Sequence, residues 1–344
     1  MKNGLKSMQK IAVVVPNWNG KDRLKACLDS LHAQTRQHQL IVVENGSADG
    51  SLEYLRQHYP DAHLVINEAN LGFAGGVNSG IKAAIEQGCD YVALLNNDAA
   101  AEPDWLEHLA ACLDSDQQVG VAACKLLTSD GLALDSTGDY YTVWGLPYPR
   151  GRNETGIDKY DGRTDVFAAS GGASLYRVKL LKEVGLFDED FFAYYEDVDL
   201  SFRARLAGWK IRYVPAARAR HQIGGTSGSL KGFTTYQTLK NLPMLLVKNV
   251  PRKYLYRVAW RFAIAQTLFF GKAVLRGHGW SAVKGKAVCL YYLPRNLRKR
   301  QRIQAAKTVS DDYVWSMIVH DLPPNAHSLR KLRAFGWKLR GKKA

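Results

Sequence analysis

The first half of the sequence alternates short apolar runs with segments of helical periodicity, and this alternation limits the folds open to the chain. Apolar residues recur at helical spacing after residue 21, after residue 77 and after Pro103. The runs between these segments predict buried strands at residues 10–15, 40–43, 63–66, 91–95 and 119–123. Strands that alternate with helices, without hairpin signals, predict an α/β fold whose mostly parallel sheet is covered by helices on both faces.

The region beyond residue 128 is less regular. Residues 128–165 are rich in Asp, Gly, Tyr and Pro, and we expect loops with short strands there. At residues 171–172 two glycines allow the backbone to approach a ligand closely, and the glycine- and serine-rich residues 224–229 are expected to be flexible. The regular elements predicted in this region are a helix at 178–184, a helix from Glu196 and a strand at 210–214.

Charge is distributed very unevenly along the 344 residues. Residues 1–225 hold 23 Lys and Arg against 29 Asp and Glu, whereas residues 226–344 hold 24 Lys and Arg against 3 Asp. The first part therefore has a net charge of −6 and the second a net charge of +21. This asymmetry predicts two domains, residues 1–228 and 229–344, and a polyanionic partner for the second, either nucleic acid or an anionic membrane face.

The C-terminal region has a helical pattern in which Lys and Arg are interleaved with large apolar residues, as in amphipathic helices that lie on membranes. Its most apolar run, residues 258–270, is interrupted by Arg261 and Gln266, and we expect it to be too short and too charged to span a bilayer. Residues 1–10 are polar, so no signal peptide is expected. Five cysteines without a Cys-x-x-Cys pair predict reduced thiols in a cytosolic setting.

The strand at residues 91–95 ends abruptly in Asn96-Asn97-Asp98. In open α/β sheets, ligands bind beyond the carboxyl ends of the strands. Oxygen ligands placed there suit a hard divalent cation, and such a cation suits a diphosphate. Asn and Asp are also common turn formers. Taken alone, this segment fits a metal site and a strand-ending turn equally well.

Glu44 ends the second predicted strand, where dinucleotide-binding proteins place a ribose-binding carboxylate. Their glycine fingerprint should follow the first strand, but residues 16–21 read PNWNGK. The glycines at residues 72–76 follow a later strand and have a different spacing. This pattern argues against a hydride-transfer enzyme, and Glu44 fits either a ribose or base ligand or a charge at a strand end.

Glu196 and Asp197 begin a predicted helix directly after a segment with four aromatic residues. The helix dipole there favours the ionised form of a carboxyl group, and an ionised carboxylate can take a proton from an alcohol. The alternative is an ordinary acidic helix start, which fits Asp199 better because Arg203 lies four residues further on. His221 fits either a surface histidine or a metal ligand.

These features belong to a series of eight segments that occur in one order between residues 10 and 228: VPNWN at 15–19, ENGSADGS at 44–51, NLGFAGGVNSG at 70–80, LLNND at 94–98, GGA at 171–173, GLFDEDFF at 185–192, YEDVDL at 195–200 and HQIGGTS at 221–227. The ordered series resembles the family 2 inverting glycosyltransferases of the GT-A fold, in their bacterial rhamnosyltransferase-like branch. The basic C-terminal helices also resemble the tails of that branch.

The resemblance implies a role for each matching position. Asp197 would be the general base, with Glu196 beside it touching the acceptor, and Asp98 and His221 would ligate Mg²⁺ or Mn²⁺. The family usually has Asp where this chain has Glu44, and also at the first position of its Asp-x-Asp element, where this chain has Asn96. The residues implied in binding the nucleotide sugar are Pro16, Asn17, Asn19, Glu44, Asn70, Gly72, Gly76, Asn78, Asn96, Asn97, Asp98 and Gly172.

The resemblance further implies an inverting transfer from a nucleotide diphosphate sugar, with dTDP-rhamnose as the first candidate, to a lipid-linked glycan acceptor in cell-surface polysaccharide synthesis. The enzyme would be cytoplasmic, with its basic helices peripheral on the anionic inner face of the membrane, and no nucleic acid is expected. Two alternatives remain. A catalytically silent sugar-nucleotide-binding relative would fit Asn96, and a nucleic-acid-binding protein would explain the basic half but not the eight segments.

Overall fold

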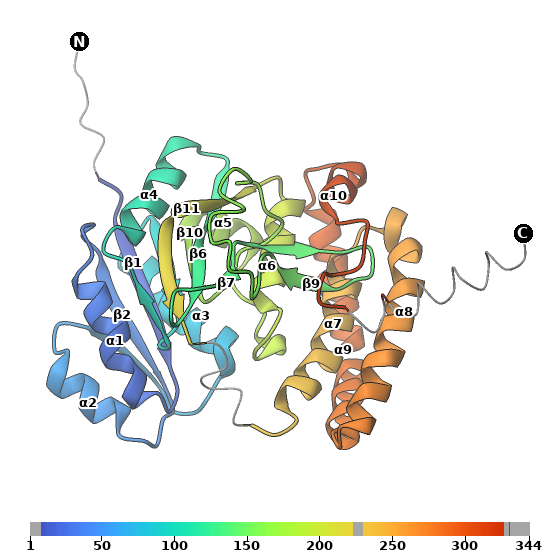
Figure 1. The fold of residues 1–344 in the computed structure, drawn as a ribbon, viewed down its shortest axis with the longest axis horizontal. Helices are drawn as coiled ribbons and strands as arrows, with labels where there is room; N and C mark the ends of the chain where they lie inside the picture. Colours follow the sequence, from blue (N-terminus) through green and yellow to red (C-terminus); the bar gives the residue numbers. More distant parts are fainter. Residues whose placement is uncertain (1–7, 223–229, 327–329, 331–344) are drawn as a thin grey trace, which may run out of the picture. The chain divides into compact units, whose positions relative to one another are not determined.

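The computed structural model describes residues 8–222, 230–326 and 330. The segment 224–229, expected to be flexible, lies outside the described residues, as do residues 1–7 of the polar N-terminal segment. The chain divides into two compact units (Figure 1). Unit 1 comprises Met1–Asp139 and Pro149–Lys231, and unit 2 comprises Tyr140–Tyr148 and Gly232–Ala344.

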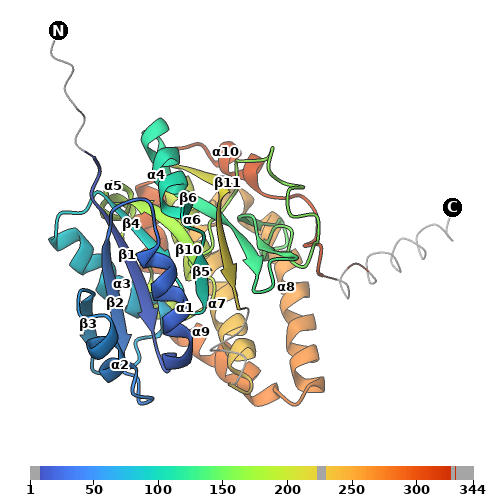
Figure 2. The ribbon, with the colours of Figure 1, turned by 60° about the vertical axis from the view of Figure 1, so that its left-hand side comes forward.

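Unit 1 is built on a nine-stranded sheet in which most strands share one direction (Figure 2). In sheet order the strands are β3 (His63–Asn67), β2 (Gln39–Asn45), β1 (Ile11–Asn17), β4 (Tyr91–Leu95), β10 (Ala173–Arg177), β6 (Val119–Thr128), β11 (Lys210–His221) and β5 (Ala99–Ala101), and β7 (Leu134–Ser136) pairs with β6. The pairs β1–β2, β1–β4, β2–β3 and β6–β11 are parallel. β10 is antiparallel to both β4 and β6, and β5 and β7 are antiparallel to their partners. The predicted α/β fold with a mostly parallel sheet is confirmed.

Helices cover both faces of this sheet. Successive side chains of a strand point to opposite faces, and the apolar side chains of β1 need cover on both. Val13 and Val15 face a core that they share with α1 (Lys21–His32), α2 (Ser51–His58) and α4 (Trp105–Ser115). Val14, between them, faces α3 (Gly72–Glu86), because a Cβ added to Gly80 would lie 2.4 Å from a methyl carbon of Val14. Glycine at this position therefore lets α3 pack directly on β1.

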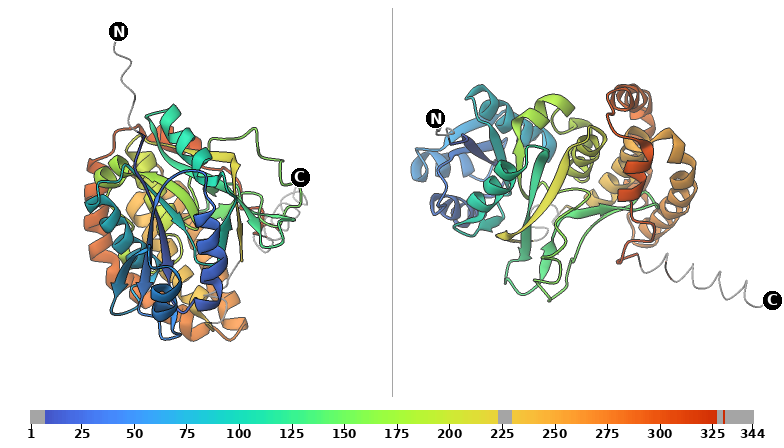
Figure 3. Two further views of the ribbon diagram at one scale, coloured as in Figure 1. Left: turned by 90° about the vertical axis from the view of Figure 1, so that its left-hand side faces the viewer. Right: turned by 90° about the horizontal axis from the view of Figure 1, so that it is seen from above.

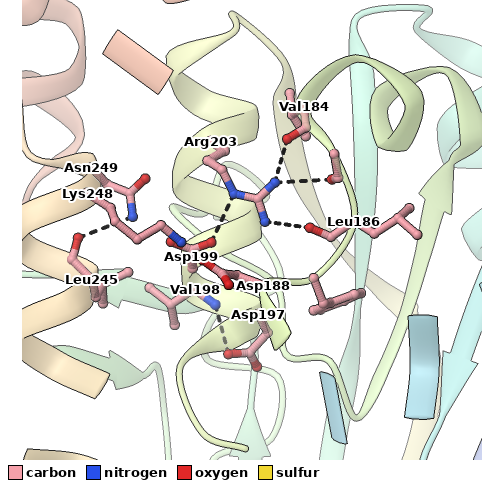
Figure 4. Close-up of polar contacts among 12 residues, drawn as sticks. Val184, Leu186, Asp188, Asp197, Val198, Asp199, Arg203, Leu245, Lys248 and Asn249 are labelled. Atoms are coloured by element: carbon pink, nitrogen blue, oxygen red, sulfur yellow. Dashed lines mark hydrogen bonds and ion pairs between the residues drawn. The ribbon is translucent and has the colours of Figure 1, made fainter. Parts of the chain in front are cut away.

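The elements after β10 position the later segments of the series. They are α5 (Val178–Val184), the 3-10 turn η1 (Glu189–Phe191) and α6 (Glu196–Leu206). The Arg203 guanidinium lies 2.9 Å from the buried Asp199 carboxylate and donates to the backbone carbonyls of Val184 and Leu186 (Figure 4). The interpretation of Asp199 as the structural partner of Arg203 is confirmed, and breaking such a buried pair typically costs about 3–5 kcal/mol.

Unit 2 is mainly helical. It contains α7 (Phe233–Asn249), α8 (Arg252–Leu275), α9 (Gly279–Ala305) and α10 (Asp311–Met317), which are orange to red in both views of Figure 3. Leu239, Ala273 and Ala282 form a buried apolar cluster that joins the first three helices. Tyr254 of α8 stacks on Trp315 of α10 with ring centroids 4.2 Å apart. A two-stranded sheet of β8 (Asp139–Tyr141) and β9 (Pro147–Pro149) completes the secondary structure.

Helix α8 is longer than the apolar run in the sequence suggests. It has 24 residues, and among the described helices it is the one long and apolar enough, by length and composition alone, to cross a membrane. Its most apolar window has a mean hydropathy of 1.2 and is 28% buried. The apolar run at residues 258–270 is itself too short to span a bilayer, and the helix reaches this length because it continues beyond the run at both ends. Core helices of soluble proteins pass the same criterion, so one such helix is weak evidence for a span.

Candidate active site

The carboxyl ends of β1, β2 and β4 bring three polar side chains together at one edge of the sheet. Asn17, at the end of β1, donates through Nδ2 to Glu44 Oε2 at 2.8 Å. Asn97, just after β4, donates through Nδ2 to Asn17 Oδ1 at 2.7 Å. All three side chains are buried. They link strand ends that are 27 and 80 residues apart in the sequence, which fixes the shape of this edge.

Glu44 is held from both of its oxygens. Besides the bond from Asn17, Oε1 accepts from the backbone N–H of Ser47 at 2.9 Å. Asn19, just after β1, binds the loop that follows β2. Its backbone N–H donates to Ser47 Oγ, and its Oδ1 accepts from the backbone N–H of Ala48. Glu44 therefore ties the end of β2 to β1 and to the loop at residues 46–48.

The glycine turn before α3 is fixed by a small amide network. Asn70 Oδ1 accepts from the backbone N–H of Gly72 at 2.8 Å and from Asn45 Nδ2 at 3.2 Å. Gly72 has φ +72°, and a Cβ there would lie 2.4 Å from the Phe192 carbonyl oxygen. Only glycine tolerates this conformation together with so close a contact. The turn therefore packs directly on the segment that precedes α6.

The Asn78 side chain is hydrogen-bonded to the segment at residues 187–189. Its Nδ2 donates to the Phe187 carbonyl at 2.8 Å and to Glu189 Oε1 at 2.9 Å, and its Oδ1 accepts from the Phe187 N–H. The side chain is 2% exposed. Both amide hydrogens are used within the protein, so Asn78 anchors the 187–189 segment. The assignment of Asn78 to nucleotide-sugar binding stays a prediction.

Asp98 and His221 lie side by side because of strand pairing. β5 begins at Ala99, and Ala99 pairs with His221 at the end of β11. This register places His221 Nε2 3.2 Å from Asp98 Oδ1. Asp98 Oδ1 is buried and has no hydrogen bond of acceptable geometry, and the same holds for Asn96 Oδ1. The residues that follow β4 thus provide a buried amide oxygen without a hydrogen-bond partner, on Asn96, and a carboxylate paired with an imidazole, on Asp98.

His221 has a second partner that sequence reasoning missed. Its Nδ1 lies 2.8 Å from Asp135 Oδ2, and Asp135, on β7, is 1% exposed. Burial opposes protonation of the imidazole, but the Asp135 and Asp98 carboxylates outweigh it and raise the pKa of His221 to about 9. Burial likewise opposes ionisation of Asp135, yet His221 and Arg152 hold the pKa of that carboxyl below its usual value.

Asp197 occupies the first turn of α6 and is held by two backbone N–H groups. Its Oδ2 accepts from Gly171 at 2.9 Å, and its Oδ1 accepts from Val198 at 2.8 Å, the second of which Figure 4 shows. We expected the helix start to favour the ionised form of Asp197. Burial has the larger effect and raises the pKa of Asp197, while the backbone N–H groups only partly oppose it.

The backbone connects Asp197 to the end of β4. Asn96 donates its backbone N–H to the Gly172 carbonyl at 2.9 Å, and Leu95 pairs with Ala173. Gly171, the neighbour of Gly172, holds the Asp197 carboxylate. The end of β4, the glycine pair and the start of α6, which lie far apart along the chain, are thereby joined at one edge of the sheet. The structure brings Asp98, His221 and Asp197 to the same region of unit 1.

The segment before Asp197 has an unusual backbone. Phe192, Tyr194 and Tyr195 have φ values of +65°, +71° and +72°. A left-handed backbone conformation costs a non-glycine residue of order 1–3 kcal/mol of stability. It persists where the surrounding structure enforces it, often at functional sites. Glu196, which follows, is buried. The strained turn aims the first residues of α6, and with them Asp197, at the glycine pair.

A second carboxylate, Asp139, lies in the electrostatic range of Asp197. Burial and then the negative charge of Asp197 raise the pKa of Asp139 to about 7. Its Oδ1 accepts from Ser136 Oγ at 2.9 Å, and its backbone bridges to Ala168. Sequence analysis missed Asp139 because it lies in the loop-rich region 128–165. The surroundings of Asp197 therefore contain one more ionisable group than the motifs suggest.

Two solved structures share this fold. The chain matches GalNAc-T7, solved with UDP, GalNAc and Mn²⁺, with a TM-score of 0.57 at 18% identity, over 72% of this chain and 49% of that one. It matches the mannosyltransferase PcManGT of Pyrobaculum calidifontis, solved with GDP-Man and Mn²⁺, with a TM-score of 0.53 at 17% identity, over 90% and 88%. The fold is that of the GT-A glycosyltransferases.

The family follows from sequence comparison. The model of "Glycosyltransferase like family 2" matches residues 9–240, and the chain belongs to that family. It is 29% identical over 238 residues to an N-acetylglucosaminyl-diphospho-decaprenol L-rhamnosyltransferase of Mycobacterium tuberculosis, covering 63% of this chain and 78% of the relative. It is 26% identical to the rhamnosyltransferase WbbL of Escherichia coli K12, covering 61% and 83%. The predicted family 2 glycosyltransferase in the rhamnosyltransferase-like branch is confirmed.

Proposed function

We propose that this glycosyltransferase transfers a sugar, with inversion, from a nucleotide diphosphate sugar to a hydroxyl group of a lipid-linked glycan, and that dTDP-rhamnose is the donor. The observation that carries the proposal is the Asp197 carboxylate, held by Gly171 and Val198 beside the end of β4. Relatives named as rhamnosyltransferases support the choice of donor, and the decaprenol-linked substrate in the name of one of them supports the choice of acceptor.

Asp197 acts as the general base. As the acceptor oxygen bonds to the anomeric carbon, the bond from that carbon to the diphosphate breaks on the opposite face, and Asp197 takes the acceptor proton. A single displacement of this kind inverts the anomeric configuration. The raised pKa of Asp197 makes it a stronger proton acceptor than an exposed carboxylate, because burial disfavours its charged form.

Asp98 and His221 fit a divalent cation such as Mn²⁺ or Mg²⁺, and Asn96 adds a neutral oxygen beside them. The fit rests on the buried Asn96 Oδ1, which has no hydrogen-bond partner, and on the Asp98 carboxylate, whose Oδ1 lies 3.2 Å from His221 Nε2. Among the described residues no group of three or more His, Cys, Asp and Glu could hold a metal. When bound, the cation would neutralise the charge that develops on the leaving diphosphate.

A donor screen tests the proposed reaction. Purified full-length protein is incubated with Mn²⁺, an N-acetylglucosaminyl diphosphate lipid and a panel of dTDP-, UDP- and GDP-sugars. We expect nucleoside diphosphate release and a glycosylated lipid with dTDP-rhamnose, and no release without the acceptor. Turnover with another donor alone would reject dTDP-rhamnose, and no turnover with any donor would favour a catalytically silent relative.

We further propose that unit 2 binds an anionic membrane surface, with the turn between α8 and α9 inserted among the lipid headgroups. At this turn Leu275 is 89% exposed and Trp280 is 69% exposed. Lys272 and Arg276 flank the same turn. Exposed aromatic and aliphatic side chains among basic residues suit the headgroup region of an anionic membrane. The net charge of +21 on residues 226–344 adds long-range attraction to such a surface.

Replacing both apolar residues at this turn, Leu275→Glu with Trp280→Glu, should weaken binding to vesicles of phosphatidylcholine and phosphatidylglycerol by about tenfold or more. Each buried side chain of this size contributes roughly 1.5–3 kcal/mol. Co-sedimentation measures the partition, and Leu132→Glu, on an exposed residue of unit 1, is the matched control. Equal partition of the double variant and the control would refute insertion of this turn. Resistance of the wild type to alkaline carbonate extraction would instead indicate that α8 spans the bilayer.

A further inference from the structure

The region that sequence analysis treated as loops contains a buried carboxylate in contact with the proposed metal ligand His221. Asp135 lies on β7, the short strand that pairs with β6. The side chain is 1% exposed, yet no motif assigns it a role. Its Oδ2 lies 2.8 Å from His221 Nδ1, on the side of the ring away from Asp98.

Arg152 fixes the orientation of the Asp135 carboxylate. An Arg152 guanidinium nitrogen lies 2.6 Å from Asp135 Oδ1, and its Nε donates to the Asp135 backbone carbonyl at 3.3 Å. Backbone hydrogen bonds from Asn153 to Leu134 and from Leu134 to Glu154 align the two segments. One oxygen of Asp135 thus forms an ion pair with Arg152, and the other contacts His221 Nδ1.

We propose that Asp135, oriented by Arg152, is the positioning residue that sets the tautomer and ring orientation of His221 for metal binding. A carboxylate is only an acceptor, so an imidazole that binds a metal through Nε2 must carry its proton on Nδ1 to bond with Asp135. Its Nε2 then presents a lone pair on the side where Asp98 Oδ1 lies, 3.2 Å away. Carboxylates that orient metal-binding histidines in this way commonly change metal affinity by about 10–100-fold.

Asp135→Asn is a sharp test because Arg152 dictates how the new amide would lie. Arg152 is a donor only, so it would hold the amide oxygen and turn the NH₂ group toward His221 Nδ1. The imidazole would then accept at Nδ1 and carry its proton on Nε2, which removes the lone pair from the metal side. Adding Arg152→Ala would release the amide, and a rotated amide could again accept from Nδ1. The double variant should therefore bind metal better than Asp135→Asn alone.

The inference rests on the proposed metal use of the enzyme, and the experiment separates the two. Mn²⁺ is titrated into the full-length wild type, Asp135→Asn, Arg152→Ala and the double variant, with and without thymidine diphosphate, and the signal of free Mn²⁺ in electron paramagnetic resonance gives Kd. We expect Asp135→Asn to raise Kd by about 10–100-fold, Arg152→Ala to change it little, and the double variant to recover most of the loss. Thermal unfolding confirms that each variant is folded.

The possible outcomes each decide one point. If the wild type binds Mn²⁺ and Asp135→Asn binds within twofold of it, or if the double variant is no better than Asp135→Asn, the positioning role is refuted and the metal site stands. If the wild type binds no Mn²⁺ under either condition, the proposed metal use is refuted, and the role of Asp135 falls with it. Recovery in the double variant is a result that a merely structural Asp135 would not give.

Discussion

Asp197→Asn is expected to lower kcat by a factor of about 10²–10⁴ while donor binding stays close to that of the wild type. Loss of a positioned general base typically has an effect of this size. The amide retains the shape of the carboxylate and can still accept a hydrogen bond from Gly171 or Val198, so the first turn of α6 should keep its place. What the amide cannot do is take the proton of the acceptor hydroxyl.

Steady-state kinetics with the active donor, together with calorimetric titration of the donor, would measure both quantities. The matched control is Asp61→Asn, which makes the same chemical change at an exposed position before β3, at the opposite end of that strand from the site. A variant at Asp197 that retains more than one tenth of the wild-type kcat would remove Asp197 as the base. A loss that appears only in donor affinity would assign it to binding.

The pH profile gives a second view of the same residue. Burial raises the pKa of Asp197, and only its ionised form can accept a proton. As the pH falls through this raised pKa, kcat/KM should therefore decline at a pH above the usual Asp value of about 3.9. The residual activity of Asp197→Asn should lack this decline. A wild-type profile that is flat on the acid side would contradict the assignment.

The regular part of the fold could be predicted because buried strands leave a clear sequence signal. The runs at 91–95 and 178–184 coincide with β4 and α5, and the expected helix from Glu196 begins at that residue. Strand direction carries no such signal. Nothing in residues 173–177 indicates that β10 is antiparallel to β4, because direction depends on where the chain returns to the sheet.

The site was harder to predict because its parts meet only through strand pairing. Sequence analysis selected Asp98 and His221 separately, but their contact depends on the pairing of Ala99 with His221 across more than 100 residues. Asp135 was missed because region 128–165 lacks periodicity. A weak signal exists there, since Asp135 follows Leu132 and Leu134 in a short alternating run, which is unusual for an exposed loop.

Asn78 has a structural role that the motif alone does not indicate. Its proximity to the glycine turn in the sequence suggested contact with the nucleotide sugar. Helical geometry indicates the structural role, because Asn78 lies four residues after Ala74 and three before Ile81, on the buried face of α3. A polar residue on the apolar face of a helix usually serves an internal hydrogen bond, and here it secures the 187–189 segment.

Asp98→Asn is expected to reduce kcat/KM by about 10³-fold, because it removes the negative charge from the proposed metal site. Stabilisation of the leaving diphosphate by a metal contributes several kcal/mol to such reactions, and each 1.36 kcal/mol corresponds to a factor of ten. The same variant should bind Mn²⁺ more weakly in the thymidine diphosphate titration. Unchanged activity together with unchanged Mn²⁺ affinity would exclude Asp98 as a ligand.

Asn96→Asp makes the opposite change and is the matched partner of that variant. It places a carboxylate where Asn96 has a buried oxygen without a hydrogen-bond partner, beside the existing charge of Asp98. Without metal, two buried carboxylates should repel each other and lower Tm. With Mn²⁺, the added negative ligand should tighten binding, so that the Mn²⁺-dependent rise in Tm exceeds that of the wild type. If Asn96→Asp lowers Tm equally with and without Mn²⁺, position 96 does not face the metal, and the cation is held by Asp98 and His221 without it.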